Sequence, residues 1–149
     1  MTPRIRQATP EDTDAVRQIA QAAYAPYVAA IGRKPAPMVA DFGAQIAQGA
    51  VWVAQAQDVL GFIAFFPRGD HMFLENVAVH PGAHGQGIGR LLIAQCEEAA
   101  RGQHLASVEL YTNARMTANL ALYPRLGYVE TERRVEDGFD RVYFRKVLM

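Results

Sequence analysis

The sequence has no excess of charge of either sign, because 15 Lys and Arg balance 15 Asp and Glu among its 149 residues. A neutral chain is not expected to bind DNA, RNA or an anionic membrane over a broad surface, although a small local anion site remains open. The longest apolar run, from Val59 to Phe66, is far shorter than the ~20 residues of a membrane-spanning helix. Residues 1–14 lack the apolar core of a secretory signal. We therefore expect a soluble, cytoplasmic protein with no nucleic-acid and no membrane partner.

Cysteine and closely spaced histidines are scarce. The single cysteine, Cys96, excludes a disulfide framework and a Cys-rich zinc module. The histidines at positions 71, 80, 84 and 104 show neither HxxxH nor HxH spacing, so we expect no metal site. Cys96 falls on the apolar side of a predicted helix, which favours a buried, unreactive thiol over a catalytic nucleophile.

The composition is typical of one globular domain. Half of the residues are apolar and a fifth are charged, which is not the composition of a disordered chain. A chain of this length can bury a full hydrophobic core. No internal repeat, low-complexity tract or Ser/Gly linker divides it. The sequence therefore predicts a single domain over residues 1–149.

The spacing of apolar residues predicts the order strand, helix, helix, three strands, helix, strand, helix and two strands. The predicted strands cover residues 4–8, 50–55, 59–66, 72–79, 105–111, 128–135 and 141–148. The predicted helices cover residues 10–23, 39–48, 87–100 and 117–126. Residues 24–38 contain three prolines and a glycine, which is typical of a long irregular connection. Because the strand–helix–strand unit over 72–111 requires a parallel crossover, the simplest class is α/β (α+β mixed), with helices on both faces of a mixed sheet.

A glycine-rich loop, residues 80–90 (HPGAHGQGIGR), follows a predicted strand and leads directly into a predicted helix. Free N–H groups at a helix N-terminus, with glycines that let a ligand approach the backbone, form a site for phosphate or pyrophosphate. The dinucleotide fingerprint GxGxxG fails because its third glycine is Arg90. The P-loop pattern fails because Ile88 and Gly89 stand where Lys and Ser or Thr belong. The alternative interpretation is that Gly85 and Gly87 only make a tight strand-to-helix turn.

Two stretches resemble motifs of one enzyme family. The run from Leu74 to Pro81 (LENVAVHP), followed by Gly85 to Gly89 (GQGIG), resembles the acetyl-CoA-binding motif of the GNAT N-acetyltransferase superfamily, written Q/R-x-x-G-x-G/A. Residues 119–128 (NLALYPRLGY) are similar to the family's later N…LYxxLGF/Y motif. The resemblance covers nearly the whole chain, since the predicted order of elements is also the family's order. It implies a GNAT-like central mixed, mostly antiparallel sheet of about seven strands with helices on both faces, and acetyl-CoA as cosubstrate.

The resemblance also implies roles for residues at matching positions. In such enzymes the strand before the loop hydrogen-bonds the pantetheine arm through its backbone, here at Val77, Ala78 and Val79. The N–H groups that hold the pyrophosphate fall here on Gly85, Gln86, Gly87, Ile88, Gly89 and Arg90. Tyr123 stands at the position of the tyrosine that protonates the leaving thiolate.

Three positions depart from the family pattern. His84 stands at the Q/R position, Met116 replaces an asparagine, and Pro124 directly follows Tyr123 and restricts its backbone. We expect Asn119, one turn before Tyr123 on the same helix face, to take over the contact with CoA.

Acetyl transfer from a thioester to an amine also needs a base, because an alkyl ammonium has a pKa near ~10.4. Glu75 alternates with Val77 and Val79, so we expect all three on one face of the strand, with Glu75 two residues before the pantetheine contact. We interpret Glu75 as the general base, acting through water. The alternative is a structural carboxylate paired with an arginine. A backbone amide in the 77–79 region is expected to stabilise the oxyanion.

These residues predict an acyltransferase that moves an acetyl group directly from acetyl-CoA to a primary amine of a small molecule or peptide. The alternative is an acyl-CoA-binding regulatory or interaction module with little or no catalysis, suggested by His84 and Pro124. Aromatic residues at positions 24, 27 and 42 line an acceptor pocket or belong to a satellite core, and the arginines at 133, 134, 141 and 145 form a solvated strand face. The last hairpin offers an edge for a homodimer.

Overall fold

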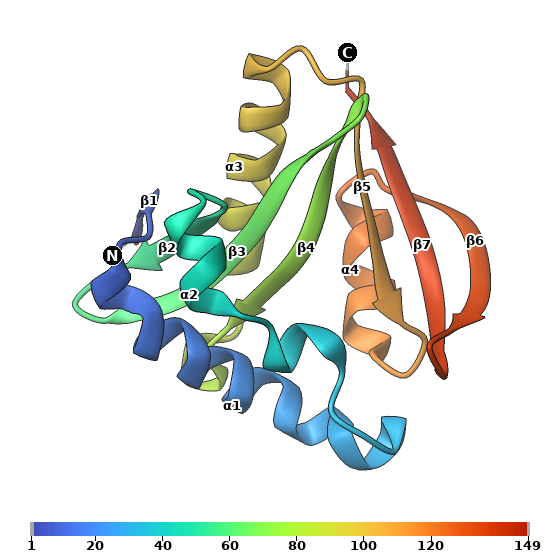
Figure 1. Cartoon of the computed structure of the whole chain (residues 1–149), viewed down its shortest axis with the longest axis horizontal. Coiled ribbons are helices and arrows are strands. Elements are labelled where there is room, and N and C mark those ends of the chain that lie inside the picture. Colours follow the sequence, from blue (N-terminus) through green and yellow to red (C-terminus); the bar gives the residue numbers. More distant parts are fainter. Residues whose placement is uncertain (1, 149) are drawn as a thin grey trace.

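Residues 2–148, which the computed structural model describes, form one seven-stranded sheet and four α-helices (Figure 1). The strands are β1 (Arg4–Gln7), β2 (Val51–Gln55), β3 (Val59–Arg68), β4 (His71–Val79), β5 (Ser107–Asn113), β6 (Val129–Glu136) and β7 (Phe139–Val147). The helices are α1 (Thr13–Ile31), α2 (Phe42–Ala47), α3 (Ile88–Gly102) and α4 (Thr117–Arg125). Short 3-10 turns cover Pro10–Asp12, Ala36–Val39 and Pro81–Ala83. The predicted order of elements and the predicted fold class are confirmed.

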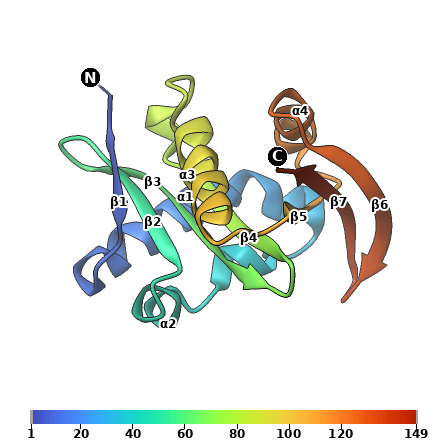
Figure 2. The same ribbon diagram turned by 90° about the horizontal axis from the view of Figure 1, so that it is seen from above.

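The sheet has the strand order β1-β2-β3-β4-β5-β7-β6, and among the described residues only the β4–β5 pair is parallel. Helices α1 and α2 cover one face, whereas α3 and α4 lie on the opposite face (Figure 2). Each layer has its own core: Val16, Phe42 and Phe62 pack between α1, α2 and the sheet, while Leu92 and Phe144 belong to the core under α3 and α4. The parallel crossover from β4 through α3 to β5 is the one that the sequence predicts.

Close packing of α3 against β3 depends on a glycine. A Cβ at Gly61 would lie 2.9 Å from the carbonyl oxygen of Ala78 and 3.2 Å from Leu92 Cδ1. No side chain fits there without displacing β4 or α3, so Gly61 sets the distance at which α3 lies on the sheet. The buried side of α3 includes Cys96, whose thiol is fully buried and has its pKa raised by that burial. The expectation of an unreactive thiol agrees with this placement.

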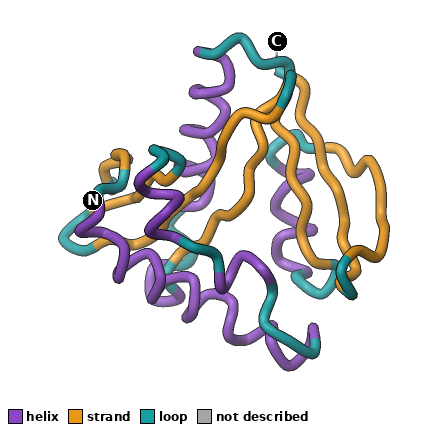
Figure 3. Tube along the Cα trace, viewed as in Figure 1, coloured by secondary structure: helices purple, strands orange, loops and turns teal. Residues whose placement is uncertain are grey.

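Helix α1 is longer than the sequence predicts. Residues 24–31 continue the helix in spite of Pro26, so the prediction of an irregular connection over 24–38 is wrong for its first half. Proline removes one N–H bond from a helix interior, but here Tyr24 is buried, and Val28 and Ile31 pack against the α1–α2 core. This packing compensates for the lost bond. The helix ends at Gly32, whose φ of 93° suits glycine, and Figure 3 shows the loop that follows.

Strands β4 and β5 pair only over their first residues and then separate. Their register joins His71 to Ser107, Met72 to Val108 and Phe73 to Glu109, and no further pair follows in residues 2–148. Beyond Phe73, the edge of β4 that faces β5 therefore has backbone groups without a strand partner. The opening between the two strands is visible in Figure 1.

Strand β4 also contains a bulge at the same level. In the β3–β4 pair, Ala64 lies opposite Asn76 and Phe65 lies opposite Leu74, so Glu75 is an extra residue on β4. The bulge interrupts the alternation of faces, and side chains before and after it no longer follow one period of two. The bulge therefore changes the face of the sheet on which the side chains of Glu75 and Asn76 lie.

No helix within residues 2–148 combines the length and the apolar character needed to cross a membrane.

Candidate active site

A groove, here called the α3 groove, runs along the end of β4 and the N-terminus of α3, with α1 and α4 on its other sides. Its volume is about 480 Å³. The predicted ligand-binding residues that line it are Val77, Ala78, Val79, Gly85, Gly87, Ile88, Gly89, Arg90 and Asn119. Gln86 is exposed and does not line it. The fold thus brings together two parts of the chain, 77–90 and the start of α4, that the motifs predicted separately.

The loop at the start of α3 is built to leave backbone N–H groups free. Gly85 and Gly87 have φ values of 81° and 75°, and a Cβ on either would meet no neighbour within 4 Å. The first N–H of the helix that finds an acceptor is that of Leu91, which donates to the carbonyl of Gly87 at 3.1 Å. Within residues 2–148, the N–H groups of residues 85–90 donate to no protein acceptor. This arrangement suits an anion.

Two arginines add positive charge to the α3 groove. Arg90 lies in the first turn of α3 and Arg125 in the last turn of α4, and both line the groove. Neither forms an ion pair with any residue from 2 to 148. The sequence interpretation missed Arg125, although its spacing of three from Leu122 and seven from Ala118, two other lining residues, placed all three on one helix face.

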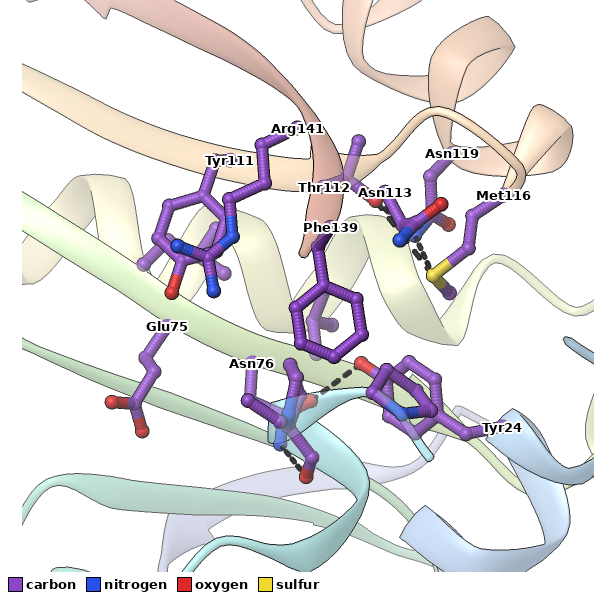
Figure 4. Close-up of a pocket in the computed structure, with 15 residues that line it drawn as sticks. Tyr24, Glu75, Asn76, Tyr111, Thr112, Asn113, Met116, Asn119, Phe139 and Arg141 are labelled. Carbon is purple, nitrogen blue, oxygen red and sulfur yellow. Dashed lines mark hydrogen bonds between the residues drawn. The ribbon is translucent and has the colours of Figure 1, made fainter. Parts of the chain in front are cut away.

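A second cavity, here called the β4–β5 pocket, lies where the two strands separate (Figure 4). It shares four lining residues with the α3 groove, namely Tyr24, Val77, Met116 and Asn119. The two cavities therefore meet at the bulged part of β4. Asn119 joins their walls, since its Nδ2 donates to Thr112 Oγ1 of β5 at 3.2 Å.

Tyr24 and Asn76 form a buried polar pair at this junction. The hydroxyl of Tyr24 donates to Asn76 Oδ1 at 2.6 Å, and Asn76 Nδ2 donates to the carbonyl of Pro37 at 2.8 Å. Burial raises the pKa of Tyr24, and the nearby Tyr123 and Tyr27 raise it further. Tyr24 thus stays protonated and holds α1 against β4. The position of Tyr24 agrees with the pocket-lining alternative, and no role was predicted for Asn76.

Glu75 lines the β4–β5 pocket, but not on the predicted face. Its carboxylate accepts a hydrogen bond from Nε2 of Gln45, on α2, whereas Val77 and Val79 pack toward the core under α3. The expectation that the three side chains share one face is wrong because the bulge inserts Glu75 as an extra residue. Within residues 2–148, Glu75 forms no ion pair, so the alternative of a carboxylate paired with an arginine does not describe this structure.

Tyr123 lies deeper than its predicted role suggests. Only 3% of the residue is exposed, and its ring packs 5.7 Å from that of Tyr128 and 5.6 Å from that of Phe144. Burial raises the pKa of Tyr123, so its phenol stays protonated at neutral pH. Tyr123 lines neither the α3 groove nor the β4–β5 pocket directly.

The family follows from a comparison with known domains. A family model described as an acetyltransferase (GNAT) domain matches residues 47–130, which is more than half of the chain and includes β4, the glycine-rich loop, α3 and α4. The chain belongs to the GNAT acetyltransferase family. No curated protein sequence matches it.

Solved structures have the same GNAT fold over the whole chain. The PaiA N-acetyltransferase of Thermoplasma acidophilum, crystallised in complex with coenzyme A, has 16% identity and a TM-score of 0.81 over 99% of this chain and 100% of that one. The ribosomal-protein-alanine N-acetyltransferase of Brucella melitensis has 27% identity and a TM-score of 0.74 over 97% and 99% of the two chains. The ribosomal-protein-S18-alanine N-acetyltransferase of Escherichia coli has 21% identity and a TM-score of 0.75 over 97% and 93%.

One group of side chains in this GNAT domain has the donor atoms of a metal site. Asp70, His71 and Glu109 each offer a ligand atom within 4.8 Å of the others. His71 Nδ1 lies 3.2 Å from Asp70 Oδ1 and 3.4 Å from Glu109 Oε2, so contacts among the three side chains already account for the cluster. The absence of a metal stays a prediction from the sequence.

Proposed function

We propose that the protein is an acetyl-CoA-dependent N-acetyltransferase that moves an acetyl group directly to a primary amine of a small molecule or peptide. The observation that carries the proposal is the junction of the α3 groove with the β4–β5 pocket. A donor in the groove and an acceptor in the pocket would meet at Val77, where β4 has no strand partner on one side. Similar structures that contain bound coenzyme A or acetyl-CoA support the choice of donor.

The residues present fit the parts of acetyl-CoA. The free N–H groups of residues 85–90, with the guanidinium groups of Arg90 and Arg125, would hold the phosphates. The free edge of β4 at residues 77–79 would hydrogen-bond the amide groups of the pantetheine arm as a neighbouring strand would. Asn119 would contact the same arm from α4.

The side chains around the junction supply acid and base. When bound, acetyl-CoA supplies the thioester carbonyl that the amine attacks. Glu75 would accept the proton of the amine through water, because it lines the pocket and its carboxylate has no ion-pair partner in residues 2–148. A backbone N–H of residues 77–79 would donate to the oxygen that becomes negative. Tyr123, kept protonated by its burial, would donate its proton to the leaving sulfur.

We extend the proposal to a single N-acetyltransferase domain over residues 1–149, and the extent of the similar structures supports it. The similar structures cover 97–99% of it and are themselves covered over 93–100% of their length. The regulatory-module alternative has no specific structural observation in its favour, since the departures at His84 and Pro124 leave the groove open and α4 intact.

The test is acetyl-CoA incubated with a panel of primary amines, with free thiol measured over time and the acetylated product identified by mass spectrometry. We expect acetyl-CoA to raise the melting temperature and at least one amine to accelerate thiol release above background. Binding without accelerated release for any amine would favour the regulatory module. No binding at all would contradict both functions.

A further inference from the structure

The β4–β5 pocket is too small to hold a whole acceptor molecule. Its volume is about 40 Å³, enough for the reacting group and little more. It shares Tyr111 and Arg141 with a larger groove of about 390 Å³. We call this third cavity the ring groove. An acceptor that occupies both the pocket and the ring groove therefore extends past Arg141.

The floor of the ring groove is a row of aromatic rings from three neighbouring strands. The ring centroids of Phe73 and Tyr111 are 5.8 Å apart, and those of Tyr111 and Tyr143 are 5.4 Å apart. Arginine side chains lie over them: Arg141 is 4.3 Å from the centre of the Tyr111 ring and Arg134 is 4.4 Å from that of Tyr143. Stacking covers one face of each guanidinium and leaves the N–H groups at its edge available.

The side chain of Arg141 is largely buried, but most of its N–H donors lack a close hydrogen-bond acceptor within residues 2–148. Its side chain is only 12% exposed, which corrects the prediction that it lies on a solvated strand face. Its single hydrogen bond within residues 2–148 is a long one, 3.5 Å from Glu136 Oε1, and its ion pairs with Glu136 at 3.5 Å and with the exposed Asp137 at 3.6 Å are long as well. Glu136 is also shared with Arg134 and Tyr143. A guanidinium has five N–H donors, so most of those on Arg141 remain free for a ligand.

The β4–β5 pocket carries two opposite charges that do not neutralise each other. Glu75 and Arg141 are its charged lining residues, and no ion pair joins them in the part of the chain that the structure describes. Figure 4 shows Arg141 lying along Tyr111, with the carboxylate of Glu75 pointing away from both. A ligand that carries both an ammonium and a carboxylate offers one group to each of these residues, whereas a simple alkylamine offers no acceptor to the free N–H groups of Arg141.

We propose that Arg141, supported by Tyr111, determines acceptor specificity by binding a carboxylate, and that the acceptor is a small amino-carboxylic acid. This inference rests on the proposed function and names the substrate class of the same site. The ammonium first loses one proton toward Glu75. The neutral nitrogen then bonds to the acetyl carbon as the carbon–sulfur bond breaks, and it loses a second proton while the sulfur gains one.

The inference is tested with matched acceptors that differ only in the carboxylate. L-phenylalanine is compared with 2-phenylethylamine, and 4-aminobutyrate with propylamine, by kcat/KM for thiol release. We expect the carboxylate to raise kcat/KM about 10-fold to 100-fold in at least one pair, the range of a charge-assisted hydrogen bond. Arg141→Gln is expected to bring that ratio close to one through a higher KM, and Arg141→Lys to restore part of it. The matched control, Arg133→Gln, changes an exposed arginine outside all three cavities and is expected to keep the ratio.

The outcomes separate this inference from the proposed function. If acetyl-CoA does not bind, or no amine accelerates thiol release, both are wrong. If neutral amines or peptides react and carboxylate-bearing amines react no better, the inference alone is overturned. An unchanged ratio in folded Arg141→Gln also overturns it. Should that variant fail to fold by its thermal transition, the wild-type ratios and Arg141→Lys still decide.

Discussion

Tyr123 and Tyr128 are neighbouring buried tyrosines with different surroundings, which makes them a matched pair. The hydroxyl of Tyr128 donates to Glu97 at 2.9 Å, whereas that of Tyr123 has no hydrogen-bond partner within residues 2–148. We expect Tyr123→Phe to lower kcat for thiol release by about 100-fold, because the leaving sulfur loses its acid, with little change in the free energy of unfolding.

The control for Tyr123 is Tyr128→Phe. This change removes a buried hydrogen bond and is expected to cost about 1 kcal/mol of folding free energy, while kcat is kept. Kinetics and thermal unfolding of both variants give the readout. Unchanged turnover in Tyr123→Phe would contradict its role as the acid.

Glu75 is tested by the pH dependence of the rate. Glu75→Gln keeps an acceptor for the hydrogen bond from Gln45 but removes the base, so we expect kcat/KM to fall and its rise with increasing pH to flatten. Glu98→Gln, which changes an exposed carboxylate paired with Arg101 on α3, serves as control and is expected to keep the wild-type profile. A pH profile unaffected by Glu75→Gln would show that another group accepts the proton.

At the level of single residues, the sequence predicts site residues that lie on one continuous segment better than site residues that strand pairing brings in from elsewhere in the chain. Residues 77–79 and 85–90 were predicted because one continuous strand–loop–helix unit carries them, and nine of the ten predicted ligand-binding residues line one groove. The face of Glu75 was mispredicted because the pairing with β3 determines the bulge. Arg141 reaches the pocket only through its pairing on β7 with Asn113 of β5, a contact that the local pattern of β7 does not contain.

The first strand and the start of α1 are linked by an ion pair that responds to pH. Arg6 donates hydrogen bonds of 2.8 and 2.9 Å to the carboxylate of Asp12, and this bonding is the main reason that the pKa of Asp12 falls from 3.8 to about 2. In the unfolded chain the carboxyl ionises at its ordinary pKa. The stabilisation is therefore complete above about pH 4 and is lost as the pH falls toward 2.

We expect Asp12→Asn to lower the free energy of unfolding at neutral pH by about 2 kcal/mol and to flatten its decline between pH 4 and 2. Denaturant unfolding at several pH values measures both effects. Asp14→Asn is the control, because Asp14 is 88% exposed in its pair with Arg17, and it is expected to change stability by less than about 0.5 kcal/mol. Equal pH curves for wild type and Asp12→Asn would rule out this linkage.

Elements were predicted well where the apolar period was uninterrupted and less well where tertiary packing overrides a local signal. Helix α3 and strand β4 begin and end within two residues of their predicted limits. The prolines of residues 24–38 suggested an irregular segment, but Tyr24, Val28 and Ile31 pack into a core that forms only after α1 lies on the sheet. That core involves residues distant in sequence, so the local pattern does not reveal the helical extension.

For the whole molecule, zero net charge and an anion site coexist because the site consists of backbone N–H groups and two arginines, which need no excess of positive side chains. Backbone N–H groups dominate this site, and Arg90 and Arg125 are its arginines. We expect the affinity for CoA, measured by calorimetry, to fall only about 10-fold or less between low and high salt.

Arg125→Gln is expected to weaken CoA binding and to flatten that salt dependence. Arg101→Gln, at the other end of α3 and paired with Glu98, is expected to do neither. A steep loss of affinity with salt that persists in Arg125→Gln would point to further cations. The expected homodimer stays a prediction; edge strand β6 exposes Val129 and Val135, by 67% and 69%.

The four residues shared by the α3 groove and the β4–β5 pocket also have a consequence for inhibitors. A bisubstrate compound, in which CoA is joined through an acetyl bridge to the nitrogen of an amino acid, would occupy both cavities at once. The bridge would cross the junction at Val77 and Asn119. Because the second half then binds at a high effective concentration, such a compound is expected to bind far more tightly than CoA or the amino acid alone.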